Sequence, residues 1–385
     1  MKAYVYTDKS LERYAGRFVW LSVNTEDAKN AAFLQKYPIP ALPTLLVLDA
    51  KRDSVALRYV GGANIAQIRT MLDDAEKTYR AQATAAADTQ LAKADDLAAA
   101  GKHAEAVKAY ESALGNAPAK WTKLGRAAES MLFSMSFAGD DERCVARAIE
   151  LYPRVRGNVS AANVAATGLN CAIALDAAKY EKRAAWIQQL EKHTREVFDD
   201  PKIVLSDDDR SGLWIALIDA RDEAGDEEAV VRMKAEWAAF LEDAAAKAAT
   251  PEQRTVYDSH RLTAYLELGA PEKAIPMLEQ SERDFPDDYN PPARLALAYK
   301  AMKQYDQALA ASDRALARVY GPRKLSVLSV RADIHAAAGD TKAARETIVQ
   351  AIEYAKALPP GQRSEGRIKS FETRLAKMEQ AAPGQ

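Results

Sequence analysis

The strongest constraint on this chain is a spacing of 34 residues between similar side chains in its C-terminal third. Tyr265 and Tyr299 are 34 residues apart, and so are Ala274 and Ala308. The next small residue of the series, Ala344, follows Ala308 after 36 residues. A repeat of this length predicts stacked antiparallel helix pairs, because each pair can bury its apolar face only against its neighbours. The alternative, an unrelated bundle of alanine-rich helices, does not account for the repeated spacing.

These positions resemble the tetratricopeptide repeat. In that family small residues let two helices approach closely, and larger residues fill the space to the next pair. The clearest unit has Gly101 at its turn, Tyr110 in its second helix and Pro118 at its close. The resemblance implies an all-α, superhelical array of such units. We expect regular units at 77–120 and 251–380, irregular helical repeats at 121–250 and a tail at 381–385.

The first 75 or so residues have a different pattern. Short runs of β-branched and aromatic residues, bounded by turn residues, predict three strands. They are residues 18–23, 44–48 and 54–60. The segment 26–37 predicts a helix stopped by Pro38, and Asn64 is placed to cap another. The stretch 75–90 lacks Pro and Gly, which predicts a helix that continues into the repeats.

This N-terminal pattern resembles the second half of a bacterial-type thioredoxin-like domain. The resemblance rests on Tyr37-Pro-Ile-Pro-Ala-Leu-Pro-Thr-Leu-Leu-Val-Leu-Asp49 and on Tyr59-Val-Gly-Gly62. In that family a Pro-Thr pair opens a strand with the proline cis, and the proline loop contacts the substrate backbone. The resemblance therefore implies an incomplete α/β thioredoxin-like domain at 1–76. Its candidate substrate-binding residues are Leu42, Pro43, Thr44 and Gly61.

The redox pair of that family is absent here, since residues 1–14 contain no cysteine. One explanation is that Met1 is internal and that a Cys-x-x-Cys and a signal peptide precede it; the other is a domain retained as a scaffold. The first is favoured because half a sheet is hard to stabilise alone. The chain would be a thiol–disulfide oxidoreductase only in the first case. Its compartment would be cytoplasmic as the sequence stands, and periplasmic if a signal peptide has been lost.

The chain's two cysteines exclude a scaffold held by several disulfides and a cysteine-based zinc site. Cys171 lies among apolar residues and is expected to be a packing thiol. Cys144 begins a helix after acidic residues that oppose a low thiol pKa, so we expect it to be unreactive as well. The acidic run from Asp207 to Arg210 predicts a capped helix start. We therefore expect neither a metal site nor a cofactor.

Charge and hydropathy restrict the partners of the chain. Its 53 basic and 55 acidic residues argue against a nucleic-acid surface, and no apolar run is long enough to span a membrane. Protein or peptide clients remain, and the first helix of each repeat would line their groove. The oligomeric state does not follow from the sequence. The candidate groove residues are Thr263, Ala293, Leu297 and Lys300, with Ser329 and Asp333 further along.

The sequence thus predicts a thioredoxin-family protein with tetratricopeptide-like repeats. Its function would be protein–protein interaction linked to thiol–disulfide exchange, without a redox cysteine pair in this chain. The alternative is a structural or adaptor helical-repeat protein with no redox role.

Overall fold

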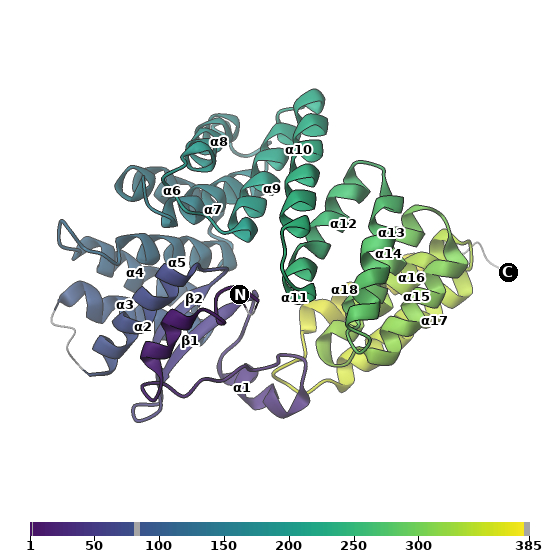
Figure 1. The fold of residues 1–385 in the computed structure, drawn as a ribbon, viewed down its shortest axis with the longest axis horizontal. Helices are drawn as coiled ribbons and strands as arrows, with labels where there is room; N and C mark the ends of the chain where they lie inside the picture. The colour runs from purple at the N-terminus through teal and green to yellow at the C-terminus, as the bar shows by residue number, and fades with distance from the viewer. Residues whose placement is uncertain (2, 81–84, 381–385) are drawn as a thin grey trace. The chain divides into compact units, whose positions relative to one another are not determined.

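The computed structural model describes residues 1, 3–80 and 85–380. The described chain is mostly α-helical and contains one two-stranded antiparallel hairpin (Figure 1). It forms two compact units, and each draws on separate stretches of sequence. Unit 1 consists of Met1–Arg17 and Tyr37–Trp237, and unit 2 consists of Phe18–Lys36 and the chain from Ala238 onward. The tail predicted at 381–385 lies outside the described residues.

The hairpin of unit 1 confirms two of the three predicted strands. Strand β1 (Thr44–Asp49) pairs with β2 (Ser54–Val60), with Thr44 opposite Val60 and Asp49 opposite Ser54. Asp49 stabilises the turn, because its side chain accepts hydrogen bonds from the backbone N–H groups of Lys51 and Arg52 at 3.0 and 3.1 Å. Every residue of β2 after Ser54 is buried, whereas β1 is partly exposed.

The third predicted strand, at 18–23, is wrong. These residues lie outside any strand, and the sheet of the described chain has only two strands. Val19 and Leu21 are 88% and 78% exposed. The apolar, β-branched pattern indicated a strand, but a strand also requires a neighbouring edge to which its backbone can hydrogen-bond. A pattern in one segment cannot supply that edge.

The predicted N-terminal helices are confirmed in part. Asn64 caps α2 (Ile65–Tyr79) through a reciprocal capping box with Gln67. The helix expected at 26–37 is shorter, consisting of a 3₁₀ turn (Ala28–Asn30) and α1 (Ala31–Lys36), and a 3₁₀ helix (Lys9–Tyr14) precedes them. The continuous helix expected over 75–90 is not formed by the described residues of this stretch, and 81–84 lie outside them. Instead α2 ends at Tyr79 and α3 begins at Ala86.

The clearest repeat predicted from the sequence is confirmed as a helix pair in unit 1. Helix α3 (Ala86–Ala99) packs against α4 (His103–Gly115), and Gly101 turns the chain with a φ of 74°. Ala94 and Ala106 are completely buried, as the close approach of two helices requires. The hydroxyl of Tyr110 donates to buried Asp95 at 2.7 Å.

Five further helices extend unit 1, and each packs against its neighbours along the chain (Figure 1). They share one continuous apolar core with α3 and α4. They are α5 (Leu124–Phe137), α6 (Asp141–Val155), α7 (Ser160–Ala174), α8 (Arg183–Asp199) and α9 (Asp207–Glu223). Ser206 caps α9 and confirms the capped start predicted there. Helix α10 (Glu227–Ala246) contains the boundary between the two units.

A disulfide joins Cys144 on α6 to Cys171 on α7, with their Cα atoms 6.3 Å apart. Both residues are buried. The interpretation of the two as separate packing thiols is therefore wrong. The antiparallel packing of α6 and α7 brings the two side chains together across 27 residues of sequence, and no local pattern indicates this pairing.

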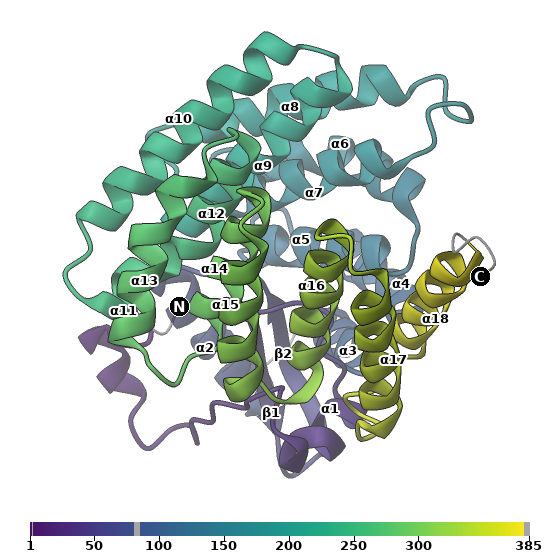
Figure 2. The same ribbon diagram turned by 90° about the vertical axis from the view of Figure 1, so that its right-hand side faces the viewer.

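Unit 2 is a second series of helix pairs, and it carries the 34-residue spacing. Figure 2 shows α14 to α18 as successive neighbours, in agreement with their contacts. The pairs are α12 (Asp258–Glu267) with α13 (Ala274–Asp284), α14 (Asn290–Ala301) with α15 (Tyr305–Arg318), and α16 (Lys324–Ala337) with α17 (Thr341–Ala357). The short α11 (Pro251–Arg254) precedes them, and α18 (Glu365–Gln380) ends the series.

Gly168 on α7 allows an unusually close approach to α6, and this leads to a prediction. A Cβ at position 168 would lie 2.3 Å from the Cβ of Ala148. Gly168→Ala should therefore destabilise unit 1 by about 1–3 kcal/mol, through overpacking that outweighs the better helix propensity of alanine. Gly212 on α9 is the matched control, because a Cβ there meets no atom within 4 Å. Gly212→Ala should stabilise by up to about 1 kcal/mol, and urea unfolding of both variants checks the opposite signs.

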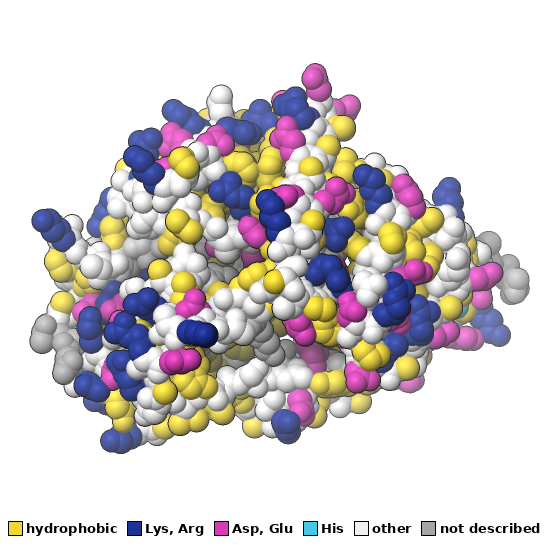
Figure 3. Space-filling model, viewed as in Figure 1, with side chains coloured by type: hydrophobic (Ala, Val, Ile, Leu, Met, Phe, Trp, Pro, Cys, Tyr) yellow, Lys and Arg dark blue, Asp and Glu magenta, His cyan; other side chains and the backbone are white. Residues whose placement is uncertain are grey.

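On the face shown in Figure 3, acidic and basic side chains are interspersed. Among the described helices, none combines the length and the apolar character needed to cross a membrane.

The fold class therefore needs a correction at the N-terminus. The resemblance implied an incomplete α/β domain with three strands, whereas the described residues form a hairpin flanked by helices of unit 1. The helical array is the dominant architecture.

Candidate functional site

The structure brings the four candidate substrate-binding residues together at one end of the hairpin. The Leu42–Pro43 peptide bond is cis, as the resemblance implied. The backbone N–H of Gly61 donates to the carbonyl of Pro43 at 2.9 Å, and the hydroxyl of Thr44 donates to the carbonyl of Ala41 at 2.7 Å. Leu42 is half exposed beside them. Substrate binding by this group stays a prediction.

The candidate groove residues lie on the first helices of their pairs. Thr263 on α12 donates to the backbone of Ser259 at 3.1 Å. On α14, Leu297, Lys300 and Ala293 are all partly buried, and Ala293 also packs against the small apolar cluster of Ala315, Val319 and Val327. The surface that remains for a partner on α14 therefore centres on Leu297 and Lys300.

Further along the array, α18 of the same chain contacts the residues of the expected groove. Ser329 and Asp333 on α16 accept hydrogen bonds from Arg374 of α18 at 3.4 and 2.6 Å. The last helix therefore covers this part of the expected groove.

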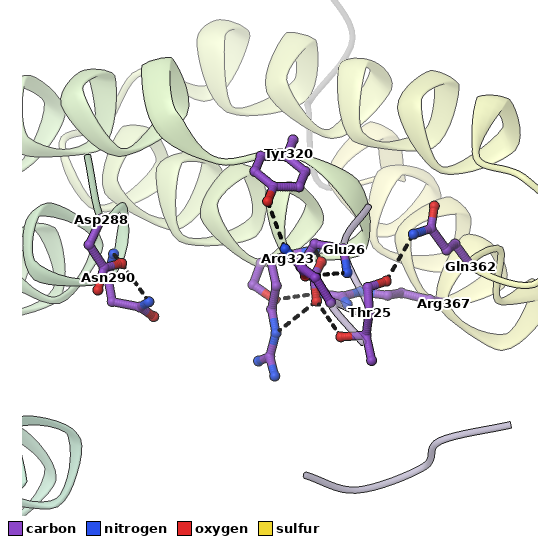
Figure 4. A network of polar contacts seen from close by, with 10 residues as sticks. Thr25, Glu26, Asp288, Asn290, Tyr320, Arg323, Gln362 and Arg367 are labelled. Atoms are coloured by element: carbon purple, nitrogen blue, oxygen red, sulfur yellow. Dashed lines mark hydrogen bonds and ion pairs between the residues drawn. The ribbon is translucent and has the colours of Figure 1, made fainter. Parts of the chain in front are cut away.

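Sequence reasoning missed a different surface of unit 2. Residues 24–36, called the docked segment here, lie against connections between successive helix pairs. These connections, called the loop edge, are residues 285–289, 319–323 and 358–364. Figure 4 shows the polar contacts between the docked segment and the loop edge.

A carboxylate of the docked segment is bound directly by the loop edge. The backbone N–H of Arg323 donates to Oε2 of Glu26 at 2.7 Å, and the guanidinium Nε lies 3.5 Å from Oε1. The hydroxyl of Thr25 donates to the same Oε1 at 3.2 Å. The Glu26 side chain is only 16% exposed, so an ion pair here is partly shielded from water.

The backbone of the docked segment is bound as well. Gln362 donates from Nε2 to the carbonyl of Thr25 at 2.8 Å, and Asn24 donates from Nδ2 to the hydroxyl of Tyr320 at 2.7 Å. Asn24 also accepts from the backbone N–H of Glu26 at 2.9 Å. This Asx turn orients Glu26 towards Arg323 (Figure 4).

Two glycines of the loop edge permit backbone-to-backbone contact with the docked segment. A Cβ on Gly321 would lie 2.2 Å from the carbonyl oxygen of Glu26. A Cβ on Gly361 would lie 1.9 Å from the carbonyl oxygen of Ala31. Any side chain at either position would therefore push the segment away.

A second guanidinium group, that of Arg367 on α18, lies near Glu26 and Arg323. Burial is the main reason that the pKa of Arg367 is lowered, and the nearby charge of Arg323 lowers it further, while Glu26 acts in the opposite direction. Arg367 donates to the hydroxyl of Ser326 at 2.6 Å. Glu26 thus lies near two guanidinium groups, while Asp287 and Asp288 of the same loop edge offset part of their charge.

Unit 1 contains a cavity of about 480 Å³ between α8, α9 and α10. The indole N–H of Trp214 in its wall is buried without a hydrogen-bond partner among the described residues. Arg221 pairs with Glu191 and lies 3.7 Å from Asp226, so carboxylates of the same wall compensate the arginine. The cavity therefore gives no clear preference for a charged ligand.

A buried carboxyl group lies between α5 and α7 in unit 1. Glu129 accepts hydrogen bonds from Nδ2 of Asn163 at 2.7 Å and from the hydroxyl of Ser160 at 3.2 Å. Burial raises its pKa to about 7, against the effect of these two hydrogen bonds. Among the described residues, no group of three His, Cys, Asp or Glu side chains is placed to hold a metal ion.

The fold defines a helical-repeat protein with tetratricopeptide-like helix pairs. No family model and no curated protein matches the chain. A chain of the APC/C hetero-tetramer Cut9–Hcn1 is similar at 14% identity and a TM-score of 0.37, over 81% of this chain and 53% of that one. Acl4, an assembly chaperone of RpL4, is similar at 14% identity and a TM-score of 0.34, over 77% of this chain and 99% of its own. The chain thus spans about half the length of the Cut9–Hcn1 chain.

Proposed function

We propose that this chain is an adaptor that binds protein partners on the first helices of its repeats. The proposal is carried by the stack of three helix pairs in unit 2, which leaves Leu297 and Lys300 partly exposed on α14. An apolar side chain beside a single cation fits an extended or helical protein segment. It does not fit a clamp for a terminal carboxylate, which needs several convergent donors.

A pair of matched variants tests this function. Leu297→Glu places a charge on the proposed binding surface, and Ala310→Glu places the same charge on an exposed position of α15. We expect Leu297→Glu to lose more than tenfold in affinity for the protein partners that purify with the wild type, because a charge would be buried in the contact. Ala310→Glu should bind the same partners with the affinity of the wild type. Equal recovery of these partners by both variants, measured by quantitative mass spectrometry, would contradict the proposed surface.

The thioredoxin resemblance adds a narrower hypothesis, in which partner binding is linked to thiol–disulfide exchange. It rests on the resemblance alone. The only two cysteines of the chain are Cys144 and Cys171, and they are bonded to each other inside the helical core. The adaptor function does not depend on this link.

A further inference from the structure

The loop edge of unit 2 is a built recognition site whose occupant is a segment of the same chain. It binds one carboxylate, one backbone carbonyl and one asparagine amide, through Arg323, Gln362 and Tyr320 respectively. These contacts involve a short sequence, Asn24-Thr25-Glu26, rather than a large apolar surface. Of the docked segment, α1 contributes two buried apolar side chains, Ala31 and Leu34.

We propose that the loop edge binds an acidic segment of a partner protein, and that the docked segment competes with this partner in cis. The partner segment would carry a glutamate in an Asx turn, followed by a short helix that begins with a small residue. Three features of the site select this chemistry. The backbone N–H and the guanidinium of Arg323 bind the carboxylate, Gln362 binds an exposed backbone carbonyl, and Gly361 leaves room only for close backbone contact. This surface is separate from the α14 surface of the proposed function.

Competition in cis has a defined consequence for affinity. A tethered occupant acts at an effective concentration in the millimolar range for short flexible tethers. A free segment of equal intrinsic affinity therefore binds only weakly while the docked segment is in place. It binds strongly when the docked segment is released, because the apparent affinity depends on the fraction of open sites.

The test uses a synthetic peptide of residues 22–37 and two full-length variants. Glu26→Lys places a cation opposite Arg323 and Arg367 and should release the docked segment. Asp27→Lys is the matched control with the same change of charge, because the Asp27 carboxylate contacts Lys29 of its own segment. Hydrogen exchange at 319–323 reports whether the loop edge is open in each protein, and circular dichroism reports that the helices remain folded.

We expect the labelled peptide to bind the Glu26→Lys chain at least tenfold more tightly than the wild type or the Asp27→Lys chain. A peptide carrying Glu26→Gln should lose at least tenfold in affinity, because the charge-assisted bond to Arg323 is gone. Adding Gly361→Leu to the Glu26→Lys chain should abolish binding, because a side chain fills the backbone contact.

Two results would overturn the proposal. One is an open, folded loop edge in Glu26→Lys that does not bind the peptide. The other is equal peptide affinity for the wild type and Glu26→Lys, which would place binding elsewhere. If hydrogen exchange shows that the docked segment of Glu26→Lys is still in place, the double variant Glu26→Lys/Ala31→Lys also removes the contact at Gly361. The peptide affinity of this double variant is then compared with that of the wild type.

Discussion

Reduction of the Cys144–Cys171 disulfide is expected to destabilise unit 1 by about 3.5 kcal/mol. The figure follows from the loop that the bond closes, since its ends are separated by 27 residues. Without the cross-link the unfolded chain gains the conformational entropy of this open loop, while the folded state keeps both sulfur atoms in the core. The loss should be largest at α6 and α7, the two helices that the bond joins.

Hydrogen exchange measured by mass spectrometry checks this expectation. Amides of α6 and α7 that exchange only through unfolding of unit 1 should exchange about 300-fold faster in the reduced protein. Amides of α16 and α17 in unit 2 are the internal control and should exchange at an unchanged rate. The oxidised and reduced wild types are compared first, because both retain the volume of the sulfur atoms.

The variant Cys144→Ala/Cys171→Ala separates the cross-link from the packing. It should be less stable than the reduced wild type as well, since each lost sulfur leaves unfilled space in a closely packed core. Alanine is preferable to serine because a buried hydroxyl would need a hydrogen-bond partner. Identical exchange of α6 and α7 in the oxidised and reduced proteins would contradict the structural role of the disulfide.

The helix pairs could be predicted from the sequence because their determinants are local and repeated. Gly101 indicates a turn, Ala94 and Ala106 indicate close helix packing, and Tyr110 fills the space between them. Each of these residues contacts neighbours within its own helix pair or the next one. The same holds for Asn64, whose cap on α2 depends on residues at most three positions away.

The disulfide and the docked segment could not be predicted, because both depend on tertiary packing. Glu26 and Arg323 are separated by 297 residues, and neither lies in a motif that names the other. Gly321 and Gly361 look like ordinary turn glycines in the sequence. Only the structure shows that backbone from the docked segment occupies the space beside them.

The strand prediction for residues 18–23 failed for a related reason. The aromatic and β-branched residues of this segment are typical of a strand, yet residues 19–23 are all exposed in the structure. Whether such a segment forms a strand depends on an edge supplied by another part of the fold. The proposed groove has the same limit. Its residues were chosen by repeat position alone, and this did not reveal that Ala293 packs against an apolar cluster while Leu297 is not part of that cluster.

Glu129 is expected to make unit 1 lose about 3 kcal/mol of stability as the pH rises from 4.5 to well above 7. Its pKa is raised from 4.5 to about 7, mainly by burial. Between these values the folded state holds a proton that the unfolded state has released, so the folded state is favoured at the acidic end. As the pH passes the folded pKa, the buried group ionises and this contribution is lost. A difference of about 2.5 pKa units corresponds to about 3 kcal/mol.

The neighbours of Glu129 compensate its charge only in part: the charge of Arg126 lowers the pKa, but burial outweighs it. Arg126 on the same helix is bound to Asp95 at 2.7 Å, and Asp209 on α9 carries a like charge whose own pKa burial also raises. The ionised carboxylate at high pH keeps the two hydrogen bonds from Asn163 and Ser160 and the attraction of Arg126. Their strength is insufficient to repay its removal from water.

Glu129→Gln isolates this contribution, because the amide retains the size of the side chain and cannot ionise. Urea unfolding of unit 1, followed by circular dichroism across the pH range, gives the free energy of each protein. As the pH rises, the free energy of unfolding of the wild type should fall by about 3 kcal/mol relative to that of Glu129→Gln, with most of the change between pH 4.5 and about 7. Subtracting the two curves removes the titration of Asp209 and of the other acids common to both. If the two curves run parallel throughout, Glu129 does not carry a raised pKa, and the charge it bears at neutral pH costs the fold nothing.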